Sequence, residues 1–309
     1  MKKEAKTYPS ISTDRIPTKS ARSGLFSILK YHNHGLKRKP LILMPAYIGW
    51  SPQEGSGLMD PVIEAGFTPV FYPIDDNLQP NFEVLNNLVL SNKKCVVLVV
   101  HYFGYKVMLP DYLRKSAVLS DVTVIEDWAH DLSQINFYET TCPSDFAIFS
   151  LHKWTASTSG GFVAGNYQVL QNLEIEAMPE IDVDIYMRTN LRTISETRWA
   201  NYFRIDPLLK GLRKLSPFNY NWSQFTCPLN FPMLARTTED RHELYKLLVE
   251  HDLNPTSLYH ILVPQLREVE YAKSIDVSSR IINLPLHQDC TETELQIMVE
   301  LILDWDLKS

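Results

Sequence analysis

The sequence predicts an α/β fold, in which a mostly parallel sheet carries helices on both faces and a smaller α+β unit follows. Three observations predict it. Short apolar runs alternate with helical patterns over the first two thirds of the chain. Those runs are apolar on both faces, as in strands covered by helices. The chain has 309 residues, 45% of them hydrophobic, which suits one large and one small unit. We place these units at 1–210 and 211–309.

Five apolar runs are the predicted strands of the large sheet. They are LILM (41–44), PVFYPI (69–74), CVVLVV (95–100), VTVI (122–125) and FAIF (146–149). Patterns at 58–65 and 81–91 predict helices between them. This alternation is typical of βαβ units, and therefore of an open parallel sheet.

The pattern changes after Gly161. Residues 166–225 have the character of helices and loops. Strands at 229–234 and 280–287 then alternate with helices at 239–253 and 290–307, and Thr291 is the expected N-cap of the last helix. This order predicts the small α+β unit.

Composition excludes several classes of protein. The net charge of −6 argues against nucleic-acid binding, which requires a basic face. The N-terminal stretch MKKEAKTYPSIS is polar and lacks the apolar core of a signal peptide, and no apolar run is long enough for a membrane span. Cys95, Cys142, Cys227 and Cys290 are far apart, so no metal site is indicated. We expect a soluble cytoplasmic protein.

Polar side chains follow the ends of the predicted strands. They are His101, Asp127, His130, Ser150 and Lys153. In open α/β sheets the ligand crevice lies outside the carboxyl ends of the strands, so these residues are candidates for one common site.

Lys153 follows the last of these strands in the stretch AIFSLHKWTASTSGG (147–161). A lysine that forms a Schiff base with an aldehyde cofactor must lie beside a phosphate-bearing ring, and Ser150 could donate its hydroxyl to that phosphate. A serine three residues before a lysine is a common pattern, so an ordinary loop lysine is an open alternative.

Asp127 lies in EDWAH (126–130) at a strand end. A carboxylate against the ring nitrogen of pyridoxal phosphate keeps that nitrogen protonated and the ring electron-withdrawing. His130 could contact the phenolic oxygen of the ring or support Asp127. The alternative is a helix N-cap aspartate followed by a surface histidine.

The turn SARSG (20–24) precedes a helical pattern. A small-residue turn that opens a helix presents backbone N–H groups to a phosphate, and Arg22 adds a positive charge. A plain capped helix is the alternative. The pieces follow one another in the order of this turn, Asp127, Ser150, Lys153 and Gly160-Gly161. This order favours the cofactor site.

With these motifs the sequence resembles the DegT/StrS family of nucleotide-sugar aminotransferases, which have the fold of fold-type-I pyridoxal phosphate enzymes. The resemblance covers most of 18–165 and 228–305. It is carried by LILMPAYIGW, VIEAGFTPVFYPID, VVHYFG, VIEDWAHD, DFAIFSLHKWTASTSGGFV and IINLPLHQDCTETELQIM, in that order.

The resemblance implies a role for each candidate residue. Lys153 would hold the cofactor as a Schiff base and then move a proton, while Asp127 would pair with the pyridine nitrogen. His130 falls on a family position beside the ring. The phosphate would be bound by Ser150 and by the turn at Ser20, Ala21 and Arg22. An aromatic residue, Trp50 by preference or else Tyr47, would stack on the ring face.

The sequence also departs from the family pattern. The gap between Ser150 and Lys153 is shorter than usual, so the reach of the lysine requires checking. The segment "N-Y-R-M", which normally reaches into a neighbouring subunit, is not recognisable, and RWANYF (198–203) is similar to a later family helix. Arg188, Arg192 and Arg198 could recognise an anionic substrate, although solvated surface charges explain them as well.

The implied function is transfer of an amino group, from glutamate, to a keto group of a nucleotide-linked sugar in polysaccharide or antibiotic-sugar synthesis. The implied cofactor is pyridoxal 5′-phosphate and the implied assembly a homodimer. One alternative is a sugar dehydratase, but in such relatives a histidine occupies the lysine position, and His152 lies beside Lys153. A second alternative is a non-catalytic protein that binds the cofactor or a sugar nucleotide.

Overall fold

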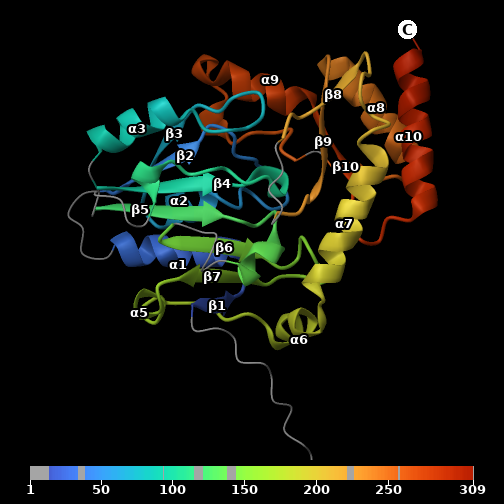
Figure 1. Ribbon diagram of the computed structural model, residues 1–309. Helices are drawn as coiled ribbons and strands as arrows, with labels where there is room; N and C mark the ends of the chain where they lie inside the picture. Colours follow the sequence, from blue (N-terminus) through green and yellow to red (C-terminus); the bar gives the residue numbers. More distant parts are fainter. Residues whose placement is uncertain are drawn as a thin grey trace, which may run out of the picture.

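The computed structural model describes residues 14–33, 39–92, 94–114, 121–137, 144–220, 226–256 and 258–308. The polar stretch MKKEAKTYPSIS, Cys142 and the residues 221–225 lie outside these ranges. Two β-sheets organise the described chain, a seven-stranded sheet and a three-stranded sheet (Figure 1).

The large sheet has the strand order β1-β7-β6-β5-β4-β2-β3. Its five predicted strands are present as β2 (Leu41–Pro45), β3 (Thr68–Tyr72), β4 (Cys95–Val100), β5 (Val122–Asp127) and β6 (Phe146–Ser150), all parallel. β7 (Gly161–Gly165) is antiparallel to β6, and β1 (Arg15–Thr18) is antiparallel to β7. The prediction of a mostly parallel sheet is therefore confirmed.

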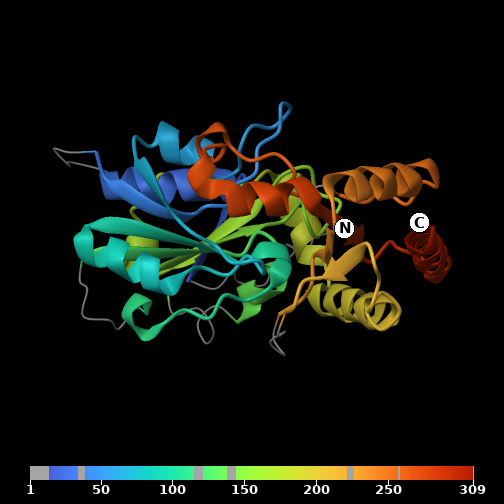
Figure 2. The same ribbon diagram turned by 90° about the horizontal axis from the view of Figure 1, so that it is seen from above.

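Helices and loops cover both faces of this sheet. Ile42, Leu98 and Ile148 pack in one hydrophobic cluster with residues of α1 (Ala21–Asn33) and α2 (Met59–Glu64). Leu43 and Val97, whose side chains alternate with these along the strands, pack in another cluster with residues of α3 (Phe82–Ser91). Figure 2 shows α1 and α3 on opposite sides of the sheet. Two-sided burial explains why the strands are apolar throughout.

The C-terminal unit is built on the antiparallel sheet β10-β9-β8. Its strands are β8 (Leu215–Pro217), β9 (Asn230–Ala235) and β10 (Ile281–Pro285), and its core is completed by α7 (Leu191–Ile205), α8 (Thr238–Glu250) and α10 (Glu292–Leu307). Thr291 caps α10 in a full capping box with Glu294, as predicted. Ile205 and Leu209 pack in this same core, and a boundary after residue 210 stays a prediction.

Some elements differ from the sequence prediction. β8 lies within 166–225, where only helices and loops are predicted. The helices α5 (Tyr167–Leu170), α6 (Glu180–Arg188) and α7 lie in the same range and agree with the prediction. The pattern also misses α9 (Ala272–Arg280), because its serines and β-branched residues favour helix weakly. α9 contacts α8 and β9, so packing rather than propensity explains it.

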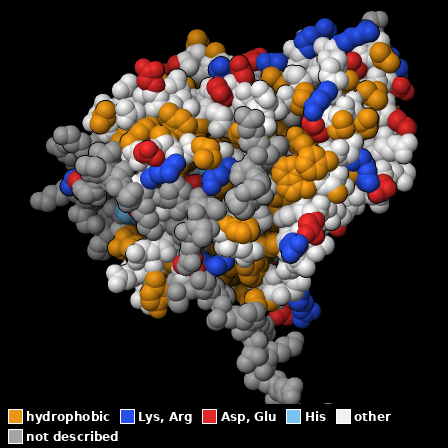
Figure 3. Space-filling view, in the orientation of Figure 1, with side chains coloured by type: hydrophobic (Ala, Val, Ile, Leu, Met, Phe, Trp, Pro, Cys, Tyr) orange, Lys and Arg blue, Asp and Glu red, His pale blue; other side chains and the backbone are white. Residues whose placement is uncertain are grey.

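The surface in Figure 3 carries charged side chains of both signs, and hydrophobic side chains gather over α7. On that helix the ring of Phe203 stacks on Trp199 and is 65% exposed. None of the described helices has the length and apolar character needed to span a bilayer.

Candidate active site

A cavity of about 720 Å³ lies at the carboxyl ends of the large sheet, on the side of the C-terminal unit. Its lining comes from the start of α1, the loop after β2, Tyr102 after β4, the ends of β5 and β6, Thr158 and Ser159, and the segment 258–261. Eight of the predicted site residues line this cavity: Ser20, Ala21, Arg22, Tyr47, Trp50, Asp127, Ser150 and Lys153. His130 lies behind it.

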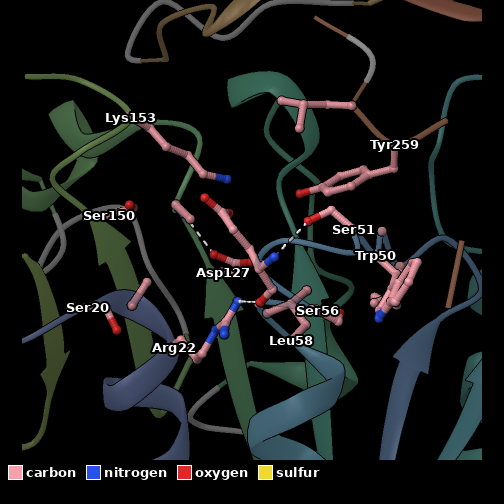
Figure 4. A pocket seen from close by; sticks show the side chains of 18 of the residues that line it. Ser20, Arg22, Trp50, Ser51, Ser56, Leu58, Asp127, Ser150, Lys153 and Tyr259 are labelled. Carbon is pink, nitrogen blue, oxygen red and sulfur yellow. Dashed lines mark hydrogen bonds between the residues drawn. The ribbon is translucent and has the colours of Figure 1, made fainter. Parts of the chain in front are cut away.

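Lys153 extends into the cavity from the turn after β6, with its amine directed toward the space above Asp127 (Figure 4). The turn is fixed by Trp154, whose backbone N–H donates to the Leu151 carbonyl and whose indole N–H donates to the His130 carbonyl. Burial lowers the pKa of the Lys153 amine, opposed by the nearby carboxylates of Asp127 and Glu54. The short gap after Ser150 thus still brings the lysine into the cavity.

His152 takes a different direction from Lys153. It is exposed to solvent, and its Nδ1 lies 3.1 Å from the hydroxyl of Ser150. It borders the cavity next to that serine, whereas the amine of Lys153 is close enough to Asp127 for the two groups to interact electrostatically. This geometry favours Lys153 over His152 as the reactive residue.

Asp127 ends β5 and lies on the floor of the cavity with 6% of its surface exposed. It accepts one hydrogen bond from the backbone N–H of Ala129, at 2.8 Å. Burial raises the pKa of its carboxyl, while that N–H, Lys153 and His101 act in the opposite direction. A protonated ring nitrogen would supply the positive partner that such a buried carboxylate favours.

The start of α1 forms one side of the cavity. Ser20 and Ser23 cap each other through reciprocal backbone and side-chain hydrogen bonds, and no acidic residue lies in the first turn. A Cβ on Gly161 would lie 2.5 Å from the Ala21 nitrogen, so this glycine allows the helix start to approach the sheet closely. Free backbone N–H groups at a helix start favour a phosphate.

Arg22 and Ser150 flank this helix start (Figure 4). The Arg22 guanidinium donates to the carbonyl of Glu54 at 2.7 Å and lies 3.8 Å from Asp60. Both side chains are therefore placed at the edge of the cavity, where the predicted phosphate contacts would be.

The aromatic residues predicted to stack on the ring occupy different positions. Tyr47 is fully buried, with its hydroxyl 3.5 Å from the Tyr259 carbonyl, and Trp50 lies to one side of Lys153 and Asp127 (Figure 4). The ring that points toward these two residues is that of Tyr259. Tyr259 is not among the residues predicted from the sequence, because a long-range pairing of its segment with residues 48–50 brings it here.

His130 has hydrogen-bond partners at both ring nitrogens. Its Nδ1 accepts from the Phe103 backbone N–H at 2.7 Å, and its Nε2 lies 3.1 Å from the Tyr259 hydroxyl. Burial, and then the charge of Lys153, lower its pKa well below the ordinary value, so the ring is neutral. His130 is therefore placed behind the cavity wall, one hydrogen bond away from the cavity itself.

The three candidate arginines do not line the cavity. Arg188 and Arg192 form exposed ion pairs with Asp184 and Glu196, as expected of surface charges. Arg198 is 1% exposed, and here the interpretation as a solvated charge is wrong. Its guanidinium lies over the Trp154 ring, and its Nε and Nη2 groups donate to Gln288 and to the Lys153 carbonyl, while Nη1 is buried without a hydrogen-bond partner among the described residues.

No cluster of metal-ligating side chains occurs among the described residues. A lysine and a buried aspartate that face one cavity from neighbouring parallel strands, beside a helix start without acidic residues, fit an α/β enzyme of the fold-type-I pyridoxal phosphate class. The chain belongs to the DegT/DnrJ/EryC1/StrS aminotransferase family, whose family model matches residues 19–173.

Solved structures of similar proteins share the fold. PseC from Helicobacter pylori, described as an aminotransferase involved in the biosynthesis of pseudoaminic acid, is 15% identical, with a TM-score of 0.73 over 94% of this chain and 86% of that chain. Spr1654 from Streptococcus pneumoniae, described as a putative sugar aminotransferase in its PMP form, is 16% identical, with a TM-score of 0.73 over 94% and 87%.

CalS13 from Micromonospora echinospora, described as a sugar aminotransferase, is also 16% identical, with a TM-score of 0.69 over 94% and 87% of the two chains. A comparison with curated protein sequences gives no match. The family match and these structures agree on a single class, the aminotransferases of fold type I.

Proposed function

We propose that this protein is a pyridoxal 5′-phosphate-dependent aminotransferase that moves an amino group from glutamate to a keto group of a nucleotide-linked sugar. The observation that carries the proposal is that Lys153 and Asp127 face one cavity from the ends of the adjacent strands β6 and β5. Family membership supports the reaction, and the sugar aminotransferases among the similar structures support the substrate class.

The residues of the cavity fit this cofactor by their chemistry. Asp127 suits a protonated ring nitrogen, the start of α1 with Arg22 and Ser150 suits a phosphate, and the amine of Lys153 suits an aldehyde. When bound, pyridoxal phosphate supplies that aldehyde and an electron-withdrawing ring. Lys153 contributes an amine whose lowered pKa leaves more of it unprotonated at neutral pH, as a nucleophile and proton acceptor requires.

The cavity residues also bear on the alternatives. A lysine in this position favours transamination over sugar dehydration, in which a histidine would take its place. A non-catalytic protein that binds the cofactor would use Lys153 and Asp127 in the same way, so reaction with glutamate is what distinguishes it from an aminotransferase. Anion recognition at this cavity falls to Arg22, the arginine among its described lining residues, because Lys153 is assigned to the cofactor aldehyde. We further propose a cytoplasmic homodimer, and sedimentation of the purified protein at the mass of one chain would contradict the dimer.

The experiment that tests the proposed function is spectroscopic. The protein purified with pyridoxal phosphate is expected to be yellow, and borohydride reduction should fix the cofactor on Lys153, as seen by peptide mass. Glutamate should then bleach the colour of unreduced protein through one half-reaction. A colourless protein without a labelled peptide would refute both enzyme hypotheses, and a yellow protein that glutamate leaves unchanged would favour dehydration or a binding protein.

A substitution on the predicted phosphate side of the cavity should weaken the binding of pyridoxal phosphate but not that of pyridoxal. Arg22→Gln is expected to weaken the binding of pyridoxal phosphate about tenfold, the size of one charge-assisted hydrogen bond. Binding of pyridoxal, which has no phosphate, should stay unchanged. Titration of both compounds measures this, with Arg188→Gln as the matched control, because Arg188 forms an exposed ion pair outside the cavity. An equal effect of Arg22→Gln on both compounds would contradict the assignment.

A further inference from the structure

The segment that carries Tyr259 is held in register against the loop after β2. The Trp50 backbone N–H donates to the Ile261 carbonyl at 3.0 Å, and the Val263 N–H donates to the Ile48 carbonyl at 2.9 Å. Gly49 and Leu262 face each other in an antiparallel bridge between these bonds. Tyr259 is thus fixed at the cavity by backbone pairing with an element of the large sheet.

Gly49 provides the space for the Tyr259 ring. A Cβ at this position would lie 1.8 Å from Cδ1 of Tyr259 and 2.6 Å from its Cγ. Any side chain here would therefore displace the ring. The position of the Tyr259 ring therefore depends on glycine at position 49.

The hydrogen bonds behind Tyr259 define the direction in which its hydroxyl donates. Because the Phe103 N–H donates to Nδ1 of His130, that nitrogen carries no hydrogen. The neutral ring then carries its hydrogen on Nε2 and donates it to the Tyr259 oxygen, at 3.1 Å. The hydrogen of the Tyr259 hydroxyl is left to donate into the cavity.

The order of groups on the pyridoxal phosphate ring indicates what this hydroxyl meets. The ring nitrogen lies opposite the aldehyde carbon, and the phosphate arm and the phenolic oxygen lie on either side of that carbon. In the proposed site Asp127 would face the ring nitrogen and Lys153 the aldehyde carbon, so these two residues define an axis through the ring. Figure 4 shows Ser20, Arg22 and Ser150 on one side of this axis and Tyr259 on the other. The phenolic oxygen therefore falls on the side of Tyr259.

We propose that Tyr259 binds the cofactor by donating its hydroxyl hydrogen to the phenolic oxygen, and that His130 is a positioning residue that acts through Tyr259. The inference rests on the proposed function, and it assigns to the C-terminal part of the chain a cofactor contact that lies outside the family match at 19–173. Tyr259 lines the cavity and His130 does not, which excludes the simpler direct contact in this arrangement.

Tyr259→Phe tests the hydroxyl and keeps the ring. We expect the dissociation constant of pyridoxal phosphate to rise about tenfold, the size of one hydrogen bond. The pH midpoint of the visible absorption band should rise by about one unit, because a phenolic oxygen without this donor holds the neighbouring proton on the Lys153 nitrogen more tightly. Absorbance titrations with cofactor and with pH measure both quantities.

Tyr112→Phe is the matched control, since it removes a hydroxyl that donates to the Phe82 carbonyl at 3.0 Å outside the cavity. It should change neither quantity. In otherwise wild-type protein, His130→Gln should shift the pH midpoint of the visible absorption band. It should have little further effect once Tyr259 is Phe, as expected of a residue that acts through the tyrosine.

Gly49→Ala adds a test of the packing. It should weaken cofactor binding when Tyr259 is present and have little effect in a Tyr259→Ala background. If the wild-type protein binds pyridoxal phosphate and Tyr259→Phe leaves both its affinity and its pH midpoint unchanged, the inference is wrong while the proposed function stands. If the wild-type protein binds none, both fail.

Discussion

Lys153→Ala is expected to abolish transamination, with a loss of about a thousandfold or more. The substitution removes the amine that attaches the cofactor and the base that moves the proton, and no other lysine lines the cavity among its described residues. Release of 2-oxoglutarate from glutamate measures the first half-reaction. Borohydride labelling of the same preparation measures the loss of covalent attachment independently of substrate identity.

Two neighbouring residues serve as controls for Lys153. Lys19→Ala removes an exposed lysine that pairs with Glu176 and should leave the activity intact. His152→Ala should reduce the activity much less than Lys153→Ala, since its side chain is exposed to solvent and contacts Ser150. Loss of activity in His152→Ala, with activity retained in Lys153→Ala and no borohydride-labelled lysine in the wild-type protein, would move the reactive position by one residue and restore the dehydratase hypothesis.

Asp127→Asn is expected to lower the rate of the glutamate half-reaction on the order of 100-fold, with little effect on folding. The amide keeps the size of the side chain and can still accept from the Ala129 N–H. It lacks the charge that keeps a ring nitrogen protonated, so the ring withdraws electrons less strongly. Rapid-mixing absorbance after addition of glutamate measures the rate on cofactor-loaded protein.

Asp145→Asn is a matched control at the other end of the sheet, where Asp145 accepts from the Val124 N–H at 2.8 Å. It should retain the wild-type rate. A comparison of unfolding temperatures separates loss of the charge from loss of structure. A wild-type rate in Asp127→Asn would show that Asp127 is not the partner of the ring nitrogen.

Much of the fold follows from local sequence patterns. β4 is apolar at every position because both faces of the sheet are covered, and this pattern is visible without any tertiary information. Thr291 is recognisable as a cap because its bonds are made to residues three positions away. Asp127, Ser150 and Lys153 share a cavity because parallel strands end at the same edge, whereas His101 and His130 do not line it.

What the sequence does not reveal depends on contacts between distant segments. Tyr259 reaches the cavity through pairing with residues more than two hundred positions earlier, and its local sequence contains no corresponding signal. Arg198 is a charged residue that the pattern places in water, but in the structure it is buried against the Trp154 ring, the Lys153 carbonyl and Gln288, which offset part of the cost of its burial. Such partners become visible only in the folded chain.

Arg198 also links the two parts of the molecule. It donates to Gln288, which follows β10, and Gln288 in turn donates to the Trp154 carbonyl in the turn that carries Lys153. Local opening of the C-terminal unit would therefore remove the Gln288 contacts from the turn that carries Lys153. Retention of the cofactor therefore reports on how far the two units open together. A destabilising substitution in the last hundred residues would weaken cofactor binding although it changes no residue of the large sheet.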